Sequence, residues 1–273
     1  MPSSFPPHQP QASAPALYQA MVLCAGRGER MRPLSDQHPK PLLEVQGKPL
    51  LQWHLERLAV AGLTHVLINT AWLGAQFPDY FEAHPPPHGL QLGYSREDLD
   101  FGAALETAGG VVRALPQLAD PFWVMAGDVY MPDFVASSKA LEAFEESPQL
   151  AHLWLVPNPS HHPSGDFRLS PEGLVQNVEA RSSTLHDPAQ GTAQTYTFST
   201  VALYKKAFFS GPWCTLPSGN PAGTRAPLAP MLKAAMALGL VGGSLFEGLW
   251  CDVGTPERLA GLQSPVPISP LAS

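Results

Sequence analysis

Short apolar runs alternate along the chain with segments in which apolar residues recur every three or four positions. The run at 20–24 stops at two closely spaced glycines, as a buried strand does where it leads into a loop. Between Pro49 and Gly62, leucines recur at i, i+4 and i+7 and predict a helix, because proline suits a first turn and glycine a helix end. The same criteria predict strands at 64–70, 90–95, 121–126 and 153–156 and helices at 72–83, 107–115 and 228–240.

This alternation predicts an α/β fold in which a Rossmann-like, mostly parallel sheet is flanked by helices on both faces. In such sheets, ligands bind at the carboxyl ends of the strands. After Pro157 the pattern changes, because short apolar runs are mixed with Pro, Gly and Ser. We expect residues 157–227 to form a β-rich insertion, after which the helix at 228–240 returns to the sheet.

Length and composition fit a single large domain between two short tails. A chain of 273 residues with 44% hydrophobic residues buries enough surface to fold without disulfides or a structural metal. Residues 1–18 are rich in proline and lack a periodic apolar face, so they are predicted to be a disordered tail. The domain is predicted at 19–265, and a second tail at 266–273.

The cysteines and the apolar runs predict a cytoplasmic protein. Cys24, Cys214 and Cys251 are odd in number and have neither the C-x-x-C spacing nor the histidine pairing of a zinc site, which favours a reducing compartment. Cys24 and Cys251 are interpreted as small packing residues rather than nucleophiles. No run approaches the ~18 residues of a membrane span, and the first residues lack the features of a signal peptide.

Acidic and basic residues are distributed unevenly. Asp and Glu number 23 against 16 Lys and Arg, so the formal net charge of -7 argues against nucleic acid or an anionic membrane as a partner. Arg27, Arg30, Arg32 and Lys40 nevertheless lie close together in sequence. A local cationic patch on an acidic protein favours a small anionic substrate.

The sharpest motif joins glycines to these cations. The segment 23–33, Leu-Cys-Ala-Gly-Arg-Gly-Glu-Arg-Met-Arg-Pro, is followed by Pro-Lys-Pro-Leu at 39–42. Glycines after a buried strand let main-chain N–H groups approach an anion or a base edge, and cationic side chains neutralise phosphate oxygens. The loop has neither the Gly-Lys-Ser/Thr of a Walker A motif nor the third glycine of a dinucleotide fingerprint, so it predicts a different phosphate cradle.

With these residues, the chain resembles the sugar-1-phosphate nucleotidyltransferases, whose opening motif is L-A-G-G-x-G-x-R-L-x-P followed by P-K-P-L. The resemblance runs from Ala20 to about Leu262 and includes Gly127-Asp128 and the late Trp-Cys-Asp-Val-Gly-Thr at 250–255. Within the family, three segments are most similar to the uridylyltransferases that act on N-acetylmuramate 1-phosphate in peptidoglycan recycling: 68–73, 105–110 and 158–167. Mannose-1-phosphate guanylyltransferases are the nearest alternative.

The resemblance implies a reaction between a nucleoside triphosphate and a sugar 1-phosphate, here UTP and N-acetylmuramate α-1-phosphate, that releases pyrophosphate. Arg30 matches the family arginine that holds the triphosphate, and Lys40 matches the lysine that neutralises charge at the reacting phosphates. Asp128 and Asp252 are implied to hold one Mg²⁺, a cation that prefers carboxylate and phosphate oxygens. The alternative for Asp128 is a turn residue or a helix N-cap.

The resemblance also implies contacts to both substrates. Nucleotide binding is implied for seven residues, which are Leu23, Ala25, Gly26, Arg27, Gly28, Glu106 and Gly109. Sugar binding is implied for the insertion, at Asn158, Asp166 and Ser199. Glu106 stands where guanylyltransferases commonly have glycine, and its alternative role is to stabilise a helix N-terminus. Arg27 is equally interpretable as a solvated loop cation.

Several features leave alternatives open. Where the family usually has Phe-Ser/Asn-Gly near the sugar, this chain has Phe198-Ser199-Thr200, which puts the sugar pocket in question. His161-His162 is interpreted as part of a loop rather than a metal site, because neighbouring side chains point opposite ways on extended backbone and no third ligand follows. The alternative functions are a mannose-1-phosphate guanylyltransferase and a catalytically silent nucleotide-sugar sensor on the same fold. The sequence indicates no oligomeric state.

Overall fold

The computed structural model describes residues 17–178 and 194–263. Most of the predicted tail at 1–18 and all of the tail at 266–273 lie outside the described residues. Tyr18 is already the first residue of a strand. The strands of the main sheet are β1 (Tyr18–Cys24), β4 (His65–Thr70), β5 (Gln91–Arg96), β6 (Leu118–Ala126), β8 (Ala151–Val156), β9 (Phe167–Leu169), β10 (Val175–Asn177), β11 (Thr195–Tyr204) and β12 (Val241–Leu245).

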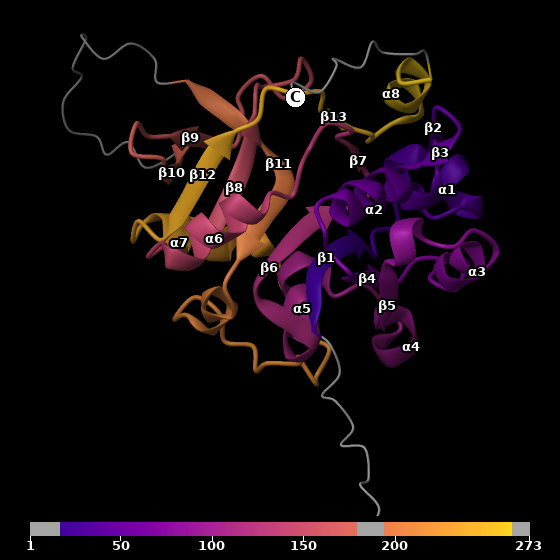
Figure 1. Ribbon diagram of the computed structural model, residues 1–273, viewed down its shortest axis with the longest axis horizontal. Helices are drawn as coiled ribbons and strands as arrows, with labels where there is room; N and C mark the ends of the chain where they lie inside the picture. Colours follow the sequence, from indigo (N-terminus) through magenta and orange to yellow (C-terminus); the bar gives the residue numbers. More distant parts are fainter. Residues whose placement is uncertain (1–16, 179–193, 264–273) are drawn as a thin grey trace, which may run out of the picture.

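All strands of this sheet except β10 and β11 run in one direction (Figure 1). β6, β1, β4 and β5 are neighbours in that order, and each pair is parallel. β11 pairs antiparallel with β6 and β8, and β12 then pairs in parallel with β8. The predicted α/β fold with a mostly parallel sheet is confirmed, and the carboxyl ends of β1, β4 and β6 meet at one edge.

Within the main sheet, one strand, β12, is absent from the prediction. Its sequence, Val-Gly-Gly-Ser-Leu, has two glycines where a strand signal needs side chains. In the structure, Gly243 is required by close packing, because a Cβ there would lie 2.5 Å from Cγ2 of Val175. The pairing with β8 therefore depends on tertiary contacts that the local pattern does not reveal.

Helices flank the sheet. They are α1 (Leu34–Gln37), α2 (Leu50–Val60), α3 (Gln76–Ala83), α4 (Glu97–Phe101), α5 (Glu106–Ala114), α6 (Ser138–Glu146), α7 (Leu228–Met236) and α8 (Pro256–Gly261). α3 starts later than predicted, because Leu73 has a φ of +50°, far from the φ of about -63° of a right-handed helix. Pro78 is the third residue of α3, where its missing N–H would have no intrahelical partner. α7 ends early, before Gly239 at a φ of +69°.

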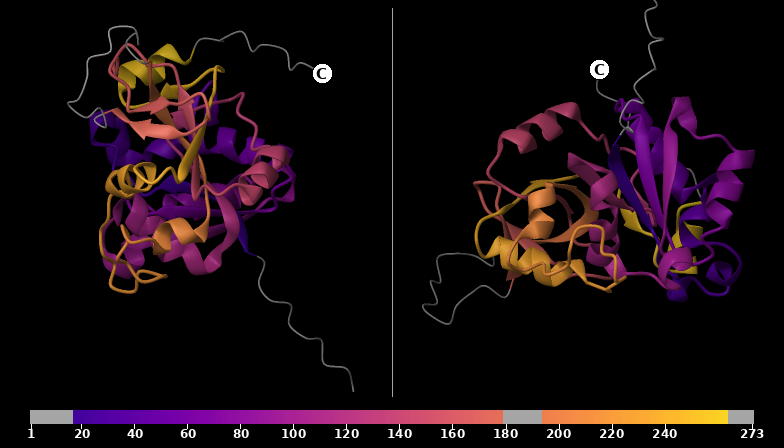
Figure 2. Two further views of the ribbon diagram at one scale, coloured as in Figure 1. Left: turned by 90° about the vertical axis from the view of Figure 1, so that its left-hand side faces the viewer. Right: turned by 90° about the horizontal axis from the view of Figure 1, so that it is seen from below.

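β1 is apolar along most of its length because helices cover both faces of the sheet. Ala20, Val22 and Cys24 pack into a core with α2, α3 and α6, whereas Met21 packs into a second core with α5 and α7. Successive side chains of a strand point to opposite faces, so a doubly covered strand becomes a continuous apolar run. The view from below in Figure 2 shows helices on both sides of the strands.

The range 157–227, predicted as one β-rich insertion, has two parts in the structure. β9 and β10 form an antiparallel pair at the start of β11. β11 itself runs through the main sheet between β6 and β8, so this part of the range belongs to the central framework. Residues 179–193, within the same range, lie outside the described residues.

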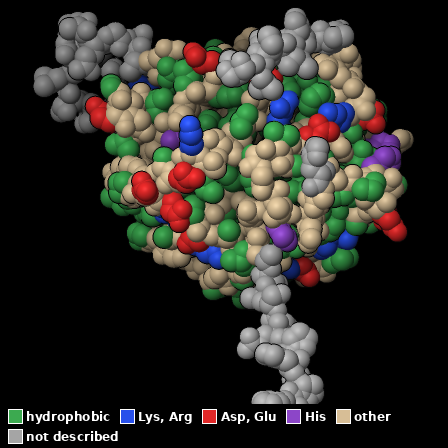
Figure 3. All heavy atoms as spheres, viewed as in Figure 1, with side chains coloured by type: hydrophobic (Ala, Val, Ile, Leu, Met, Phe, Trp, Pro, Cys, Tyr) green, Lys and Arg blue, Asp and Glu red, His purple; other side chains and the backbone are tan. Residues whose placement is uncertain are grey.

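Two short ladders complete the described fold, β2 (Glu44–Val45) with β3 (Lys48–Pro49) and β7 (Val129–Tyr130) with β13 (Cys251–Asp252). Among the described residues, none of the helices has the length and apolar character needed to cross a membrane. On the face drawn in Figure 3, hydrophobic side chains are interspersed with polar and charged ones.

Candidate active site

The glycine-rich loop starts where β1 ends and folds over the side chain of Lys40. Gly28 has a φ of +64°, which favours glycine, and a Cβ there would lie 3.3 Å from Cβ of Lys40. At Gly26 a Cβ would meet nothing within 4 Å, so the backbone of the loop faces open space. Lys40 begins the short 3-10 helix Lys40–Leu42, and its side chain is only 7% exposed.

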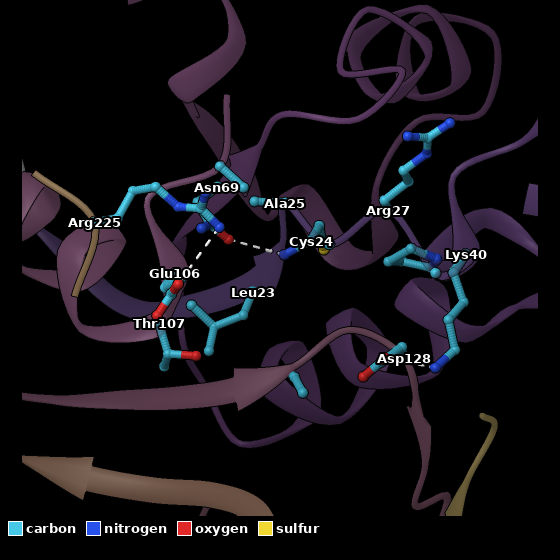
Figure 4. Close-up of a pocket in the computed structure, with 15 residues that line it drawn as sticks. Leu23, Cys24, Ala25, Arg27, Lys40, Asn69, Glu106, Thr107, Asp128 and Arg225 are labelled. Atoms are coloured by element: carbon cyan, nitrogen blue, oxygen red, sulfur yellow. Dashed lines mark hydrogen bonds and ion pairs between the residues drawn. The ribbon is translucent and has the colours of Figure 1, made fainter. Parts of the chain in front are cut away.

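A cavity of about 500 Å³ lies between this loop and the N-terminus of α5 (Figure 4). Six of the seven residues predicted to bind the nucleotide line it, together with Lys40 and Asp128: Leu23, Ala25, Gly26, Arg27, Gly28 and Glu106. Figure 4 shows Lys40 and Asp128 at one end and Glu106, Thr107 and Arg225 at the other. The structure thus gathers residues from six separate segments around one space.

The two predicted metal ligands meet because β7 pairs with β13, which places Asp252 opposite Val129. Lys40 Nζ lies 2.7 Å from Oδ2 of Asp128 and 4.0 Å from Oδ1 of Asp252. Arg258, which the sequence analysis missed, holds the far side of Asp252 at 2.8 Å. One buried ammonium group therefore lies between two carboxylates that are 124 residues apart in sequence (252 minus 128).

These residues fit a hard divalent cation. Asp128 and Asp252 both line one hollow and offer carboxylate oxygens, the donors that Mg²⁺ prefers. The described residues contain no group of three or more His, Cys, Asp or Glu that could hold a metal by themselves. Phosphate oxygens of a substrate would complete such a site, as Mg²⁺ sites in nucleotide enzymes commonly require.

A buried histidine fixes the turn that carries Asp128. His54 of α2 is almost fully buried, and its Nε2 lies 2.8 Å from the carbonyl oxygen of Val129. Burial lowers the pKa of His54 to about 4, so the ring is neutral near pH 7 and donates its N–H to that carbonyl. The position of Asp128 is thereby fixed from the core side.

A chain of buried hydrogen bonds organises the other end of the cavity. The N–H of Cys24 donates to Oδ1 of Asn69 at 2.8 Å, and Nδ2 of Asn69 donates to Oε1 of Glu97 at 2.9 Å. Oε2 of Glu97 accepts the N–H of Leu105 at 2.8 Å. Glu97 is 0% exposed, and burial raises the pKa of its carboxyl. This network ties the end of β1 to the loop that precedes α5.

Glu106, the first residue of α5, has a φ of +61°. Only a few per cent of residues other than glycine adopt this region. Its carboxylate lies 3.4 Å from Nη2 of Arg225, and both side chains are substantially exposed. The predicted position at the start of a helix is confirmed, and the side chain faces a cation at the mouth of the cavity.

Gly109 packs against a neighbouring loop. The carbonyl oxygen of Ala226 accepts the N–H groups of Ala108 and Gly109, at 3.0 and 3.1 Å. A Cβ on Gly109 would lie 2.7 Å from the carbonyl oxygen of Thr224. Gly109 therefore admits the loop that carries Arg225 and is not among the residues that line the cavity.

Two further spaces adjoin the first. An apolar cavity of about 560 Å³ lies between β6, β11 and α7, and its rim includes Glu106, Thr107 and Asp166. A polar hollow of about 450 Å³ is lined by Arg30, Asp128, His161, His162, Asp252 and Arg258, among others. Both spaces share Phe198 and Thr200. The second and third spaces thus meet at β11, beside the two carboxylates.

The three predicted sugar-binding residues differ in their surroundings. Asp166 lines the apolar cavity, accepts the N–H of Phe198 at 2.8 Å and lies 3.0 Å from Nε2 of His162. The amide of Asn158 is used by the start of β11, where it donates to Thr195 and accepts from the hydroxyl of Thr197. Of these positions, Asp166 is the one that faces a cavity in the described structure.

Ser199, the third of these residues, is 0% exposed. Its hydroxyl oxygen accepts the N–H of Val201 at 3.2 Å, and its carbonyl oxygen accepts the indole N–H of Trp250 at 3.1 Å. The neighbouring Thr200 lines the cavities instead. Ser199 does not line these two cavities, and the register of β11 against β8 shifts at this point, between Phe198 and Ala202. Sugar binding by Ser199 stays a prediction.

The arginines of the loop separate in space. Arg30 lines the polar hollow, where a Cβ on Gly254 would lie 3.2 Å from its Nη2. Arg27 lines the first cavity, and its guanidinium lies 4.5 Å from the ring centre of Trp72. Arg27 thus has both an aromatic partner and access to the cavity, so both interpretations of it stay open.

His161 and His162 both line the hollow, because the chain makes a turn at this point and is not extended. Nε2 of His161 lies 4.0 Å from Oδ2 of Asp252. The interpretation of the pair as part of a loop is confirmed, and both residues line the same hollow. The paired histidines were visible in the sequence, but only the turn brings them to Asp252.

The two cysteines near the site behave as packing residues. Burial raises the pKa of the Cys24 thiol well above its usual value, and burial also raises that of Cys251. A Cβ on Gly127 would lie 2.6 Å from Sγ of Cys24, so the thiol fills the space above the glycine. A protonated, enclosed thiol is a poor nucleophile.

The order of the strands and the loop after β1 define the class: the chain belongs to the NTP transferase family, and the profile of the MobA-like NTP transferase domain matches residues 20–188. The chain is 44% identical over 248 residues to the N-acetylmuramate alpha-1-phosphate uridylyltransferase of Neisseria meningitidis serogroup B, covering 90% of this chain and 97% of that protein. The predicted family is confirmed.

More distant proteins share the fold. A mannose-1-phosphate guanylyltransferase of Mycobacterium tuberculosis is 29% identical, over 87% of this chain and 61% of its own length. A Bacillus anthracis crystal structure, described as a glucose-1-phosphate thymidylyltransferase, superposes with a TM-score of 0.69 at 18% identity, over 90% of this chain and 94% of that one. At this identity the likeness defines the fold and leaves the substrate open.

Proposed function

We propose that the protein transfers a uridylyl group from UTP to N-acetylmuramate α-1-phosphate, with release of pyrophosphate and formation of a UDP-sugar for peptidoglycan recycling in the cytoplasm. The observation that carries the proposal is the 44% identity to a uridylyltransferase of this specificity along 97% of that protein. The guanylyltransferase alternative has less support, because the mannose-1-phosphate guanylyltransferase of Mycobacterium tuberculosis is 29% identical to this chain, which covers 61% of that protein.

The geometry supports an in-line transfer between two bound phosphates. An oxygen of the sugar phosphate attacks the α-phosphorus, and pyrophosphate leaves from the opposite side. Lys40, buried beside Asp128 at 2.7 Å, would stabilise charge on the phosphoryl oxygens, and Arg30 would hold the triphosphate. Mg²⁺ held by Asp128 and Asp252 would neutralise the phosphates and align them. No protein nucleophile is required.

The acceptor sugar would occupy the spaces beside β11. The apolar cavity offers Phe167 and Phe198 to the sugar ring and its methyl groups, and Asp166 accepts hydrogen bonds from hydroxyls. N-acetylmuramate also carries a lactyl carboxylate, which needs donors. In the adjoining hollow, Arg258 supplies a cationic donor. Burial lowers the pKa of His161, so this ring supplies a neutral N–H donor beside it.

The experiment is a panel of UTP, GTP, CTP and dTTP against several sugar 1-phosphates, with pyrophosphate release as the readout and Asp128→Asn as the blank. We expect the fastest release with UTP and N-acetylmuramate α-1-phosphate. A protein that binds nucleotide-sugars tightly but releases no pyrophosphate with any pair would instead be the silent sensor. Fastest release with GTP and mannose 1-phosphate would establish the guanylyltransferase alternative.

A further inference from the structure

Thr200 has a backbone conformation that its side chain disfavours. Its φ is +69°, in the left-handed region where β-branched residues are rare outliers. It lies in a bulge of β11, where the pairing with β8 shifts between Phe198 and Ala202. Such conformations persist when the surrounding structure enforces them, and they concentrate at ligand-binding sites.

The surrounding structure does enforce it. The carbonyl oxygen of Ser199 accepts the indole N–H of Trp250 at 3.1 Å and the hydroxyl of Thr200. The buried hydroxyl of Ser199 accepts the N–H of Val201 at 3.2 Å. Ser199 is thus anchored by Trp250, and its hydroxyl bridges across Thr200 to Val201. Thr200 itself lines the adjoining cavities.

The side chain of Thr200 lies where two spaces meet. It lines the apolar cavity together with Asp166, and it lines the polar hollow together with His161 and Asp252. Glycine would satisfy the same φ without strain and would leave this boundary open. The chain therefore carries a β-branched side chain at the position where both acceptor spaces can be narrowed at once.

We propose that Thr200 is a specificity-determining residue for the acceptor sugar. Its methyl and hydroxyl groups form the partition between the apolar cavity and the polar hollow, and so fix which ring substituent enters each space. This inference rests on the proposed function, because it concerns the acceptor of the same reaction. Thr200 then increases selectivity for the acceptor sugar and lowers the free energy of unfolding.

The test compares Thr200→Gly and Thr200→Asn with the unsubstituted chain. Asparagine tolerates the left-handed region and retains a side chain, whereas glycine removes the partition. The first readout is the Tm. The second is the ratio of kcat/KM for N-acetylmuramate α-1-phosphate over N-acetylglucosamine α-1-phosphate, which lacks only the lactyl group. Gln46→Gly is the matched control, since Gln46 has a φ of +54° in the turn between β2 and β3, outside these cavities.

We expect Thr200→Gly to raise the Tm by about 2 °C or more, because strain is relieved. The same substitution should lower the acceptor ratio by about tenfold, the scale of losing one shape-selective contact. Thr200→Asn should also raise the Tm, and it should lower the acceptor ratio less than Thr200→Gly does. Gln46→Gly should leave the acceptor ratio unchanged. An acceptor ratio that stays within about twofold in an active Thr200→Gly enzyme would overturn the inference, as would a lowered Tm.

These outcomes separate the inference from the proposal beneath it. Absence of turnover by the unsubstituted chain with UTP and either acceptor contradicts the proposed function and this inference together. Normal turnover with an unaltered acceptor ratio in Thr200→Gly contradicts the inference alone. The acceptor ratio could also change in Gln46→Gly by as much as in Thr200→Gly. That result would show that relief of backbone strain alone alters selectivity, and it would overturn the inference that Thr200 separates the two spaces.

Discussion

The two ends of the site are built differently. At the end proposed to bind the nucleotide, which we call the nucleotide end, β1 and β4 are joined to α4 and to the loop before α5 by buried hydrogen bonds through Asn69 and Glu97. At the end proposed to bind the acceptor sugar, which we call the acceptor end, the antiparallel strand β11 carries a bulge, and the polar contacts are partly exposed pairs such as His162 with Asp166.

This difference has a physical meaning. Main-chain groups held by a buried network cannot be altered by one substitution without unpairing another buried group. Half-exposed side chains on a bulged strand can change with little effect on the sheet. We therefore expect the nucleotide end to govern whether the reaction occurs, and the acceptor end to govern which sugar is used.

The largest effect should come from the two aspartates. Asp128→Asn and Asp252→Asn are each expected to abolish turnover, and the double variant should be no worse, because both hold one Mg²⁺. Chelation with EDTA should do the same to the unsubstituted protein. Mn²⁺ binding in the presence of nucleotide, followed by electron paramagnetic resonance, should weaken in each single variant.

Asp166→Asn is the matched control at the acceptor end, and it should keep the metal dependence while changing the KM for the sugar phosphate. Full activity in EDTA, or a parental rate for Asp252→Asn, would contradict a shared metal site.

Lys40→Ala should lower kcat by about 10²-fold or more, because a buried ammonium group near the phosphates stabilises charge that develops in the transition state. Lys48→Ala provides the control, since Lys48 pairs with Glu56 outside the cavity. Steady-state kinetics and circular dichroism of both variants check the prediction. A folded Lys40→Ala enzyme with near-normal kcat would remove Lys40 from the mechanism.

Acidification should lower the free energy of unfolding of the protein through His54. Its pKa is about 4 when folded and about 6.5 when unfolded, so the unfolded chain binds more protons between these values. The contribution is present in full above pH 6.5 and is lost as the pH falls toward 4, by about 2 to 3 kcal/mol. Denaturant unfolding at a series of pH values measures this loss.

His54→Gln retains a donor for Val129 without titrating and should show a correspondingly flatter pH dependence. Burial also lowers the pKa of His152 to about 4. His152 therefore makes the same contribution to the pH dependence of the unfolding free energy in the unsubstituted protein and in His54→Gln. Parallel pH curves for the two proteins would disprove the role of His54.

Glu97→Gln should raise the KM for the nucleotide about tenfold with a smaller change in kcat. Both carboxylate oxygens accept N–H groups, and glutamine would turn one of them into a donor that faces a donor, at a cost of about 1 to 3 kcal/mol. Ser95→Ala is the nearby control, because the buried hydroxyl of Ser95 has no hydrogen-bond partner among the described residues. Equal KM values in the two variants would argue against a positioning role for Glu97.

The sequence predicted the parallel half of the fold, and six of the seven residues predicted to bind the nucleotide line one cavity, because both depend on local signals. A continuous apolar run marks a doubly covered strand, and glycines next to Arg30 and Lys40 mark a phosphate loop. The meeting of Asp128 with Asp252 followed from the family resemblance, and the pairing of β7 with β13 explains it.

The acceptor end was less predictable, because its geometry arises from tertiary contacts. No pattern in the sequence predicts the bulge that exposes Thr200 and buries Ser199. The role of Arg258 depends on the start of α8 meeting β13, and that of Glu97 on two loops that are joined only in the folded chain. None of these contacts follows from periodicity.

The central claim is tested most directly by competition in one tube. Equal concentrations of UTP and GTP are mixed with N-acetylmuramate α-1-phosphate and mannose 1-phosphate, and the products are identified by mass. Buried donors and acceptors that fit one base are left unpaired by another, so discrimination by several powers of ten is attainable. We predict that the UDP-sugar of N-acetylmuramate forms faster than GDP-mannose. Faster formation of GDP-mannose would contradict the proposed specificity at both ends of the site.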